Sequence, residues 1–169
     1  MAKKTPPKTD EPTEGGVKIV ALNRKARFNY FILESFEAGI VLKGWEIKSI
    51  RAGEVNINEA YVRPQDGEVW LLGAHINPYK YTKDVEPDPV RKRKLLLNRS
   101  EINKLVAKVK LRGHTIVPLK LYLKNGKAKI EIGVAKGKEG ADKRHSIRDR
   151  EVKRNMDRAI RGPKPNWKR

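Results

Sequence analysis

The chain has 169 residues, and its 39 Lys and Arg against 20 Asp and Glu give a net charge of +19. A protein this basic attracts polyanions, so nucleic acid is the first partner class to consider. The absence of Cys excludes disulfides and thiolate metal sites. No apolar run approaches the roughly 18 residues of a membrane span, and no signal-peptide pattern opens the chain. We therefore expect a cytoplasmic protein that does not bind membranes.

Three parts are expected along the chain. Residues 1–16 are rich in Lys, Pro, Thr and Glu, which is typical of a disordered leader. Residues 17–135 carry the regular apolar patterns of one domain. Residues 136–169 contain 13 basic and five acidic residues but little apolar surface. We expect them to form a basic tail without a core of its own.

The first half of the domain is expected to consist of strands around one short helix. The predicted elements are two strand segments over Phe28–Leu42 with a bend or bulge at Gly39, a helix over Gly44–Gly53, and strands at Val55–Val62 and Glu68–Ile76. Asp66-Gly67 separates the last two strands and is typical of a hairpin turn, because both residues tolerate positive φ.

The next segment predicts a loop and then a helix. Tyr79–Arg91 contains two prolines among charged residues and is expected to be a loop. Asn98 and Glu101 have the spacing of a helical capping box. One apolar helical face follows, formed by Ile102, Leu105, Val106 and Val109. Gly113 is expected to end this helix.

A β-hairpin is predicted around Asn125-Gly126, between strands Thr115–Lys124 and Lys127–Ala135. Alternation points Val117, Leu119, Leu121, Leu123, Ala128, Ile130, Ile132 and Val134 inward. The outer face then carries Lys120, Tyr122, Lys124, Lys127, Lys129 and Glu131 and is basic. The whole pattern predicts a mainly β fold with two or three helices. Its expected form is a small closed antiparallel barrel of the oligonucleotide-binding type, followed by the basic tail.

The tail contains a weak helical pattern. Val152, Met156 and Ile160 recur every four residues, and acidic and basic residues alternate at i, i+4. This predicts a helix over 142–160 that cannot bury enough surface to fold alone. We expect the tail to be disordered in the free protein and helical only along a polyanionic channel.

No arrangement of residues indicates catalysis. The three histidines, His75, His114 and His145, lie in separate predicted elements without metal-ligand spacing. The segment 133–138 differs from a P-loop, because three residues separate its glycines instead of four and Glu139 stands where Ser or Thr must bind magnesium. We expect no enzymatic activity, no metal and no cofactor.

Basic residues beside aromatic ones remain as candidates for binding. Arg24, Lys25 and Arg27 precede Phe28 and Tyr30, a pattern suited to phosphate contacts next to a base-stacking platform. Alternatively, the two aromatic residues belong to the core of the first strand. The four basic residues at 91–94 form either a solvated face or a phosphate-contacting surface.

Four ordered blocks resemble the SsrA-binding protein family, also called small protein B. They are Val20–Arg27 with Tyr30-Phe31 and Phe36–Ile40; Gly44–Gly53; Asp88-Pro89 with Arg91, Arg93 and Lys94–Asn98; and Gly133–Lys138 with Asp142-Lys143-Arg144. The similarity extends over about 17–161. Two positions depart from the family pattern, since Ala141 replaces an aromatic residue before Asp142, and Val152 replaces a Trp.

This resemblance implies a specific function. Members of the family use an oligonucleotide-binding-type barrel to hold the tRNA-like domain of transfer-messenger RNA, in place of the missing anticodon stem. Their basic tail follows the empty messenger channel of a stalled ribosome past the 16S ribosomal RNA decoding centre, so that translation switches templates. The expected partners of this chain, itself a monomer, are therefore transfer-messenger RNA and the ribosome.

The resemblance also assigns residues. By position, the RNA-facing residues of the barrel are Asn23, Tyr30, Glu37, Leu96 and Lys129, and we add Arg24, Arg27 and Arg51 for their charge. The residues expected in the decoding centre and channel are Lys136, Gly137, Lys138, Asp142, Lys143 and Arg144. Composition alone leaves two other classes open. One is a structural ribosomal protein or initiation factor that binds ribosomal RNA, and the other is an RNA-processing enzyme.

Overall fold

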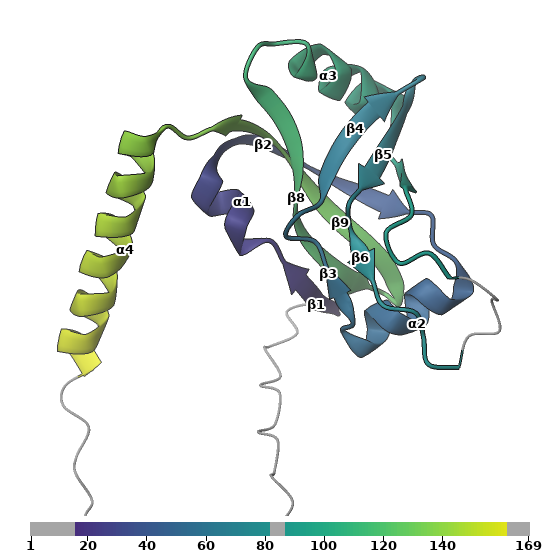
Figure 1. The fold of residues 1–169 in the computed structure, drawn as a ribbon, viewed down its shortest axis with the longest axis horizontal. Helices are drawn as coiled ribbons and strands as arrows, with labels where there is room; N and C mark the ends of the chain where they lie inside the picture. The colour runs from purple at the N-terminus through teal and green to yellow at the C-terminus, as the bar shows by residue number, and fades with distance from the viewer. Residues whose placement is uncertain (1–15, 82–86, 162–169) are drawn as a thin grey trace, which may run out of the picture.

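The computed structural model describes residues 16–81 and 87–161 (Figure 1). Nearly all of the predicted leader lies outside these residues. The elements are β1 (Val17–Leu22), α1 (Arg24–Asn29), β2 (Tyr30–Ile40), α2 (Gly44–Ala52), β3 (Val55–Asn56), β4 (Tyr61–Gln65), β5 (Glu68–Leu72), β6 (His75–Ile76), β7 (Arg93–Leu96), α3 (Arg99–Val109), β8 (His114–Lys124), β9 (Lys127–Gly137) and α4 (Gly140–Arg161). The chain is mainly β with several helices, as predicted.

Antiparallel pairing joins seven strands in the order β1-β8-β4-β5-β7-β2-β9. β9 also pairs with β8, so the sequence of pairings leads back to β8. The longest pairing is in the hairpin of β8 and β9, which have 11 residues each. It runs from His114 opposite Lys136 to Lys124 opposite Lys127. Val62 and Ile116 join β4 to β8. β3 and β6 form a separate two-stranded sheet.

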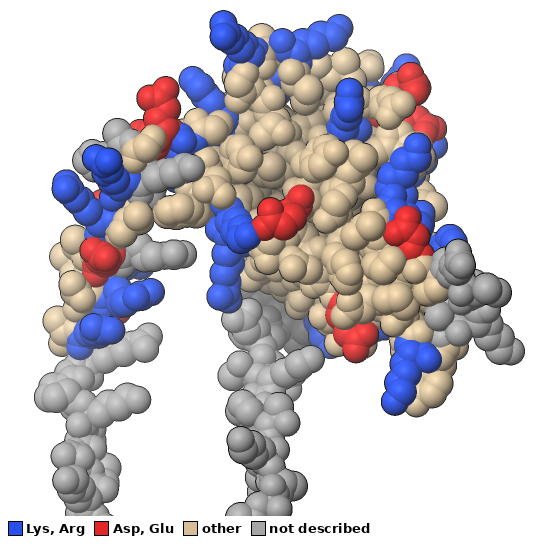
Figure 2. Space-filling model, viewed as in Figure 1, with Lys and Arg blue, Asp and Glu red and all other residues tan. Residues whose placement is uncertain are grey.

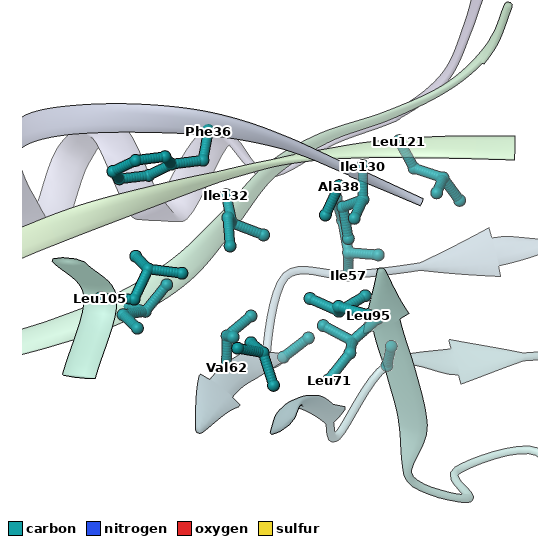
Figure 3. Close-up of a cluster of buried hydrophobic side chains, with 14 of the residues drawn as sticks. Phe36, Ala38, Ile57, Val62, Leu71, Leu95, Leu105, Leu121, Ile130 and Ile132 are labelled. Carbon is teal, nitrogen blue, oxygen red and sulfur yellow. The ribbon is translucent and has the colours of Figure 1, made fainter. Parts of the chain in front are cut away.

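The main hydrophobic core lies between these strands (Figure 3). Ile130 and Ile132 of β9 are fully buried against Ala38 of β2. Helix α3 contributes Leu105, which is also fully buried. The capping box that orients α3 is present as predicted, because the Asn98 amide donates to the Glu101 carboxylate at 2.9 Å.

The predicted inward row of β8 is wrong for two of its four residues. A β-bulge between Pro118 and Lys120 shifts the register, so the side-chain alternation changes face there. Leu121 packs in the main core, whereas Val117 and Leu119 pack in a second cluster with Ala26 and Ala135. The bulge thus gives β8 a buried surface on each side of the sheet.

Both predicted hairpin turns are confirmed. Asp66 and Gly67 have φ values of 51° and 74°, and Asn125 and Gly126 have 50° and 74°. Positive φ at both central residues is the signature of a type I′ turn, which suits the twist of paired strands. Helix α2 is also present where the sequence placed it.

Three predicted boundaries change near the start of the domain. Phe28 belongs to helix α1 instead of a strand, because Asn23 caps that helix through a hydrogen bond from the Ala26 amide. The bulge in β2 lies between Ile32 and Glu34, so there is no break at Gly39. The strand expected over Val55–Val62 is interrupted after Asn56, whose side chain accepts from the Asn58 amide and turns the backbone.

Other boundaries change further along. Helix α3 ends at Val109, and Gly113 takes its left-handed conformation in the turn before β8. Strand β7 was not predicted, because its residues were read as a basic run. β9 continues to Gly137, two residues past the expected end of the barrel, since Lys136 and Gly137 pair with Phe31 and Tyr30 of β2.

The predicted tail helix is present as α4, which extends away from the sheet (Figure 1). It contacts the rest of the molecule at α1. Its apolar row is exposed, with Val152 at 54% and Ile160 at 83% of full exposure. The expectation that this helix forms only along an RNA channel stays a prediction.

A buried ion cluster fixes α2 against β7. Glu46 of α2 and Arg93 of β7 are both fully buried, and Arg93 Nε donates to Glu46 Oε1 at 2.8 Å. Arg91 also pairs with Glu46, and the Lys43 amide donates to its Oε2 at 2.6 Å. The remaining Arg93 donors reach the backbone oxygens of Ala74, Arg91 and Pro89. Each of the three charged groups therefore has a partner of opposite charge.

This environment sets the protonation of Glu46. Burial by itself would raise the pKa of this carboxyl group. Hydrogen bonds from Arg91 and from the Lys43 amide, with the charge of Arg93, outweigh burial and hold the pKa below its ordinary value of 4.5. Because the folded state favours the charged form, the cluster contributes stability at neutral pH and loses it as the pH falls through the lowered pKa.

We expect Glu46→Gln to lower the free energy of unfolding by about 3 kcal/mol at pH 7, because it leaves the Arg93 charge buried without a counter-charge. The difference from the wild type should shrink as the pH falls below 4.5. Glu101→Gln is the matched control, since Glu101 also accepts from its N-cap amide but forms no ion pair among the described residues. Denaturant unfolding across pH measures both. An equal loss in the two variants would contradict the role of the ion cluster.

Candidate nucleic-acid interface

The outer side of β8, β9 and β2 carries a cluster of charges. We call it the hairpin surface, and it consists of Glu37, Lys120, Tyr122, Lys124, Lys129 and Glu131. Glu37 projects from β2, and its carboxylate oxygens lie 3.6 Å from Lys124 Nζ and 3.7 Å from Lys129 Nζ. Lys120 pairs with Glu131 at 2.7 Å. The predicted basic face is therefore present, and one acid in it draws two lysines together.

Tyr122 explains why an acid can lie on a basic face. This residue is buried, and its hydroxyl donates a hydrogen bond to Glu37. That bond, with the charges of Lys124 and Lys129, lowers the pKa of Glu37 against the opposing effect of burial. Burial and the same bond raise the pKa of Tyr122. At neutral pH the pair is thus a carboxylate and a phenol, and Glu37 orients the lysines beside it.

A groove of about 390 Å³ lies next to this surface. Its lining residues come from the end of β2, the start of α2, β7 and the β8–β9 turn: Gly39, Ile40, Leu42, Lys43, Gly44, Ile47, Leu96, Gly126, Lys127, Ala128 and Lys129. Leu96 is half exposed there, and a Cβ at Gly39 would lie 3.3 Å from its Cβ. The groove combines apolar side chains with three lysines, which suits a nucleotide with its phosphate.

Arg51 connects α2 to the same region. It lies in the last turn of α2, and its Nη2 donates to the carbonyl oxygen of Gly126 at 3.4 Å. The structure therefore brings together four of the predicted RNA-facing residues. Glu37, Arg51, Leu96 and Lys129 all lie at or beside the hairpin turn.

The other four predicted barrel residues lie near α1. Arg24 and Arg27 are exposed, and Tyr30 is half-buried against the second cluster. Asn23 is only 4% exposed, and its amide group donates to the Ile57 carbonyl while its oxygen caps α1. Asn23 is therefore buried in this structure, and both groups of its side-chain amide bond to the protein. It positions the two arginines by anchoring the helix that carries them.

The start of the tail joins this second region. Lys138 lies with its Nζ 4.9 Å from the centre of the Phe31 ring, and its amide donates to the Asn29 carbonyl at 2.9 Å. Lys136 and Gly137 belong to β9 beside it. Asp142 accepts from the Glu139 amide at the start of α4. Arg144 is exposed on α4, and the side chain of Lys143 lies outside the described residues.

The predicted site residues thus divide into two regions at opposite ends of β2. Tyr30 opens this strand, and Glu37 lies seven residues further along it. At about 3.3 Å per residue these two positions are roughly 23 Å apart. Because one nucleotide cannot span this distance, an RNA that contacts both regions must contribute several nucleotides.

The basic run at 91–94 does not form one phosphate-contacting surface. Arg93 is fully buried and Arg91 pairs with Glu46, so both are structural. Only Lys92 and Lys94 point their charges outward, and Lys94 pairs with Glu68. Local sequence could not show this, because Glu46 lies 47 residues before Arg93.

Basic side chains also lie outside the two regions described above. On the face in Figure 2, Lys and Arg side chains lie along α4 and at the end of the molecule where Figure 1 shows α3, and acidic ones lie among them. Among the described residues, no group of three His, Asp or Glu could hold a metal ion. No helix in the described part is long and apolar enough to cross a membrane.

Comparison with known proteins identifies the family. The SmpB protein family model matches residues 20–162. An SsrA-binding protein of Desulfitobacterium hafniense is 53% identical over 146 residues, which cover 86% of this chain and 94% of that protein. One from Geobacillus thermodenitrificans is 52% identical over 148 residues, covering 88% and 96%. The chain belongs to the SmpB family.

A solved structure agrees with this assignment to the SmpB family. A chain described under "tmRNA-SmpB: a journey to the center of the bacterial ribosome" is 47% identical and has a TM-score of 0.61. The match covers 71% of this chain and 85% of that one. The resemblance read from four sequence blocks is therefore confirmed at the level of the family and of the β-plus-α fold.

We expect Tyr122→Phe to reduce the free energy of unfolding by about 1 kcal/mol at pH 7, since solvent partly screens its bond to Glu37. The bond is stronger to the carboxylate than to the neutral carboxyl group, and the lowered pKa of Glu37 keeps it charged down to below 4.5. The loss should therefore shrink in strong acid. Tyr61→Phe is the control, because Tyr61 is exposed and no hydrogen bond of its hydroxyl is seen in the described region. A loss of the same size in acid and at pH 7 would show that packing is responsible instead.

Proposed function

We propose that this chain binds the tRNA-like domain of transfer-messenger RNA and accompanies it into stalled ribosomes for trans-translation. The observation that carries this proposal is the SmpB family match across residues 20–162, together with the likeness to a chain from a tmRNA–SmpB structure. The names of the relatives, SsrA-binding proteins, support it. The net charge of +19 supplies the electrostatic attraction that RNA binding needs.

The sheet serves as a barrel of the oligonucleotide-binding type. The return of the strand pairings to β8 supports this reading, and the long β8–β9 hairpin forms its widest surface. Such barrels bind RNA through exposed strand faces and loops. The protein acts by binding alone, without enzymatic activity or cofactor, as a monomer in the cytoplasm.

The hairpin surface and the groove are the first RNA-binding region. Lys129, with Arg51, contacts phosphates, and Leu96 packs against an unstacked base in the groove. Glu37 holds Lys129 in position through the network that includes Tyr122. Arg24, Arg27 and Tyr30 form a second contact near α1, and Asn23 supports it from within.

The tail provides the contacts with the ribosome. Lys136, Gly137 and Lys138 lie where the sheet ends, and Asp142, Lys143 and Arg144 follow in the first turns of α4. The exposure of Val152 and Met156 supports a helix that gains its full set of contacts only inside the messenger channel, against 16S ribosomal RNA. In the free protein the order of this helix is marginal, because it buries little apolar surface.

Lys129→Ala should weaken binding to a tRNA-like-domain RNA by about 1–3 kcal/mol, the value of a charge-assisted contact. Glu37→Gln removes a negative charge yet should also weaken binding, because Lys124 and Lys129 lose their shared partner. A fluorescence titration at fixed salt measures both variants. Lys104→Ala on exposed α3 is the control for charge alone. Equal losses for Lys129→Ala and Lys104→Ala would reject the hairpin surface as the contact.

Ending the chain after Glu139 should leave affinity for the tRNA-like domain unchanged and abolish tagging in a reconstituted trans-translation assay. This endpoint keeps all of β9 and the bond between the Lys138 amide and Asn29, so the sheet stays complete. Circular dichroism of the full chain with and without ribosomes tests the disorder of α4. If the shortened protein lost RNA affinity and tagging together, the two functions would not separate at this boundary.

A further inference from the structure

A row of side chains crosses the outer face of three neighbouring strands, and none of its residues belongs to the two regions described above. Arg63 of β4 lies opposite Trp70 of β5, and Trp70 lies opposite Lys94 of β7. Their sequence neighbours Val62, Val69 and Leu95 are buried, so alternation turns the row outward. We call Arg63, Trp70, Lys92 and Lys94 the tryptophan row. β4, β5 and β7 lie on the side of the molecule far from α4 (Figure 1).

The row combines an accessible aromatic ring with cations. Trp70 is half-buried, and Lys92 Nζ lies 5.1 Å from the centre of its ring. Arg63 and Lys92 are exposed, and among the described residues neither pairs with an acid. Lys94 has Glu68 as its partner. The row therefore contains two positive charges without counter-charges beside one indole ring.

The row is held on a rigid support. Arg93 lies between Lys92 and Lys94 and is fixed by Glu46 and three backbone oxygens. Arg91, on the other side of Lys92, also bonds Glu46 and donates to the Lys92 carbonyl at 3.3 Å. The backbone of Lys92 is thus held at both sides while its side chain reaches solvent.

We propose that the tryptophan row binds unpaired RNA, with one base stacked on Trp70 and the adjoining phosphates on Arg63 and Lys92. Neighbouring strands are about 4.8 Å apart, so both cations lie within reach of the phosphates next to a stacked base. Indole rings and bases stack without regard to sequence, and exposed arginine and lysine supply the phosphate contacts. The row binds single strands because a base inside a duplex cannot offer its face.

The strengths of the two interactions favour replacement of Lys92 by an RNA base on the Trp70 ring. An exposed cation–π contact changes an equilibrium constant by about two- to fivefold, whereas stacking of one base on an aromatic ring changes it by about five- to 150-fold. A base can therefore displace Lys92 from Trp70, and the released ammonium group then meets a phosphate. In the absence of RNA, Lys92 covers the ring.

The test is binding of the full chain to fluorescein-labelled decauridylate, with a ten-base-pair RNA duplex as the comparison. Trp70→Leu should weaken binding to the single strand by about five- to 150-fold and leave duplex binding nearly unchanged. Trp70→Phe should lose less, because it keeps a ring. Tyr81→Leu is the matched control, since Tyr81 is 73% exposed and also lies near a lysine. Thermal unfolding checks that each variant is folded.

A second pair of variants leaves Trp70 and the buried residues of the sheet unchanged. Arg63→Ala with Lys92→Ala removes only exposed side chains and should weaken decauridylate binding more than Lys104→Ala with Lys110→Ala, which has the same charge. The change in tryptophan emission on adding decauridylate should be smaller in Trp70→Phe than in the wild type. Equal binding by Trp70→Leu and Tyr81→Leu, or equal losses in the two double variants, would overturn the proposal.

The same titrations keep this proposal apart from the proposed function. Wild-type affinity for the tRNA-like-domain RNA tests the function, and the variants of the tryptophan row are judged on decauridylate. A wild type that fails to bind the tRNA-like domain would reject the function and leave the result for the row standing.

Discussion

The buried contact between Glu46 and Arg93 is the interaction on which the rest of the binding surface depends. It joins helix α2 to strand β7, two elements that are neither consecutive nor paired by backbone hydrogen bonds. The groove beside the hairpin exists because this contact fixes the start of α2 next to Leu96 at the end of β7. The same contact holds the backbone around Lys92. A hydrophobic pair could be as stable, but it would not orient two arginines and a helix N-terminus around one carboxylate.

A second acid performs a similar task at the surface. Glu37 accepts from buried Tyr122 and lies between Lys124 and Lys129, so the hydroxyl fixes the acid and the acid fixes the lysines. Lysine side chains lose rotamer entropy when RNA orders them. A carboxylate that already restricts them reduces that cost, although it lowers the local positive charge by one. On this basic protein we expect the saving in rotamer entropy to outweigh the loss of one positive charge, because many other lysines and arginines remain.

The sequence predicted the elements whose cause is local. Asp66-Gly67, Asn125-Gly126 and the Asn98–Glu101 box act over two to four residues, and each appears where expected. Features that depend on distant partners were missed. The bulge at Pro118 reverses the facing of Val117 and Leu119. Arg93 is buried because Glu46 lies nearby in space, and Asn23 is buried because α1 and Ile57 use its whole amide. The family resemblance gave positions for the site, and the structure separates supporting residues from exposed ones.

The geometry of β2 and β9 links RNA binding to the tail. Glu37, in the second half of β2, pairs in register with Glu131, and Tyr30, the first residue of β2, pairs with Gly137, three residues before the start of α4. Lys138 then contacts Asn29 and Arg27 of α1 through its amide and its ammonium group. A two-stranded ladder, shifted in register at the bulge between Ile32 and Glu34, thus connects the hairpin surface to the base of the tail. Because hydrogen-bonded strands resist shear and stretch, this ladder fixes the base of the tail relative to the hairpin turn. The direction of the tail is set at the short segment after Gly137, where the ladder ends and the polypeptide can turn.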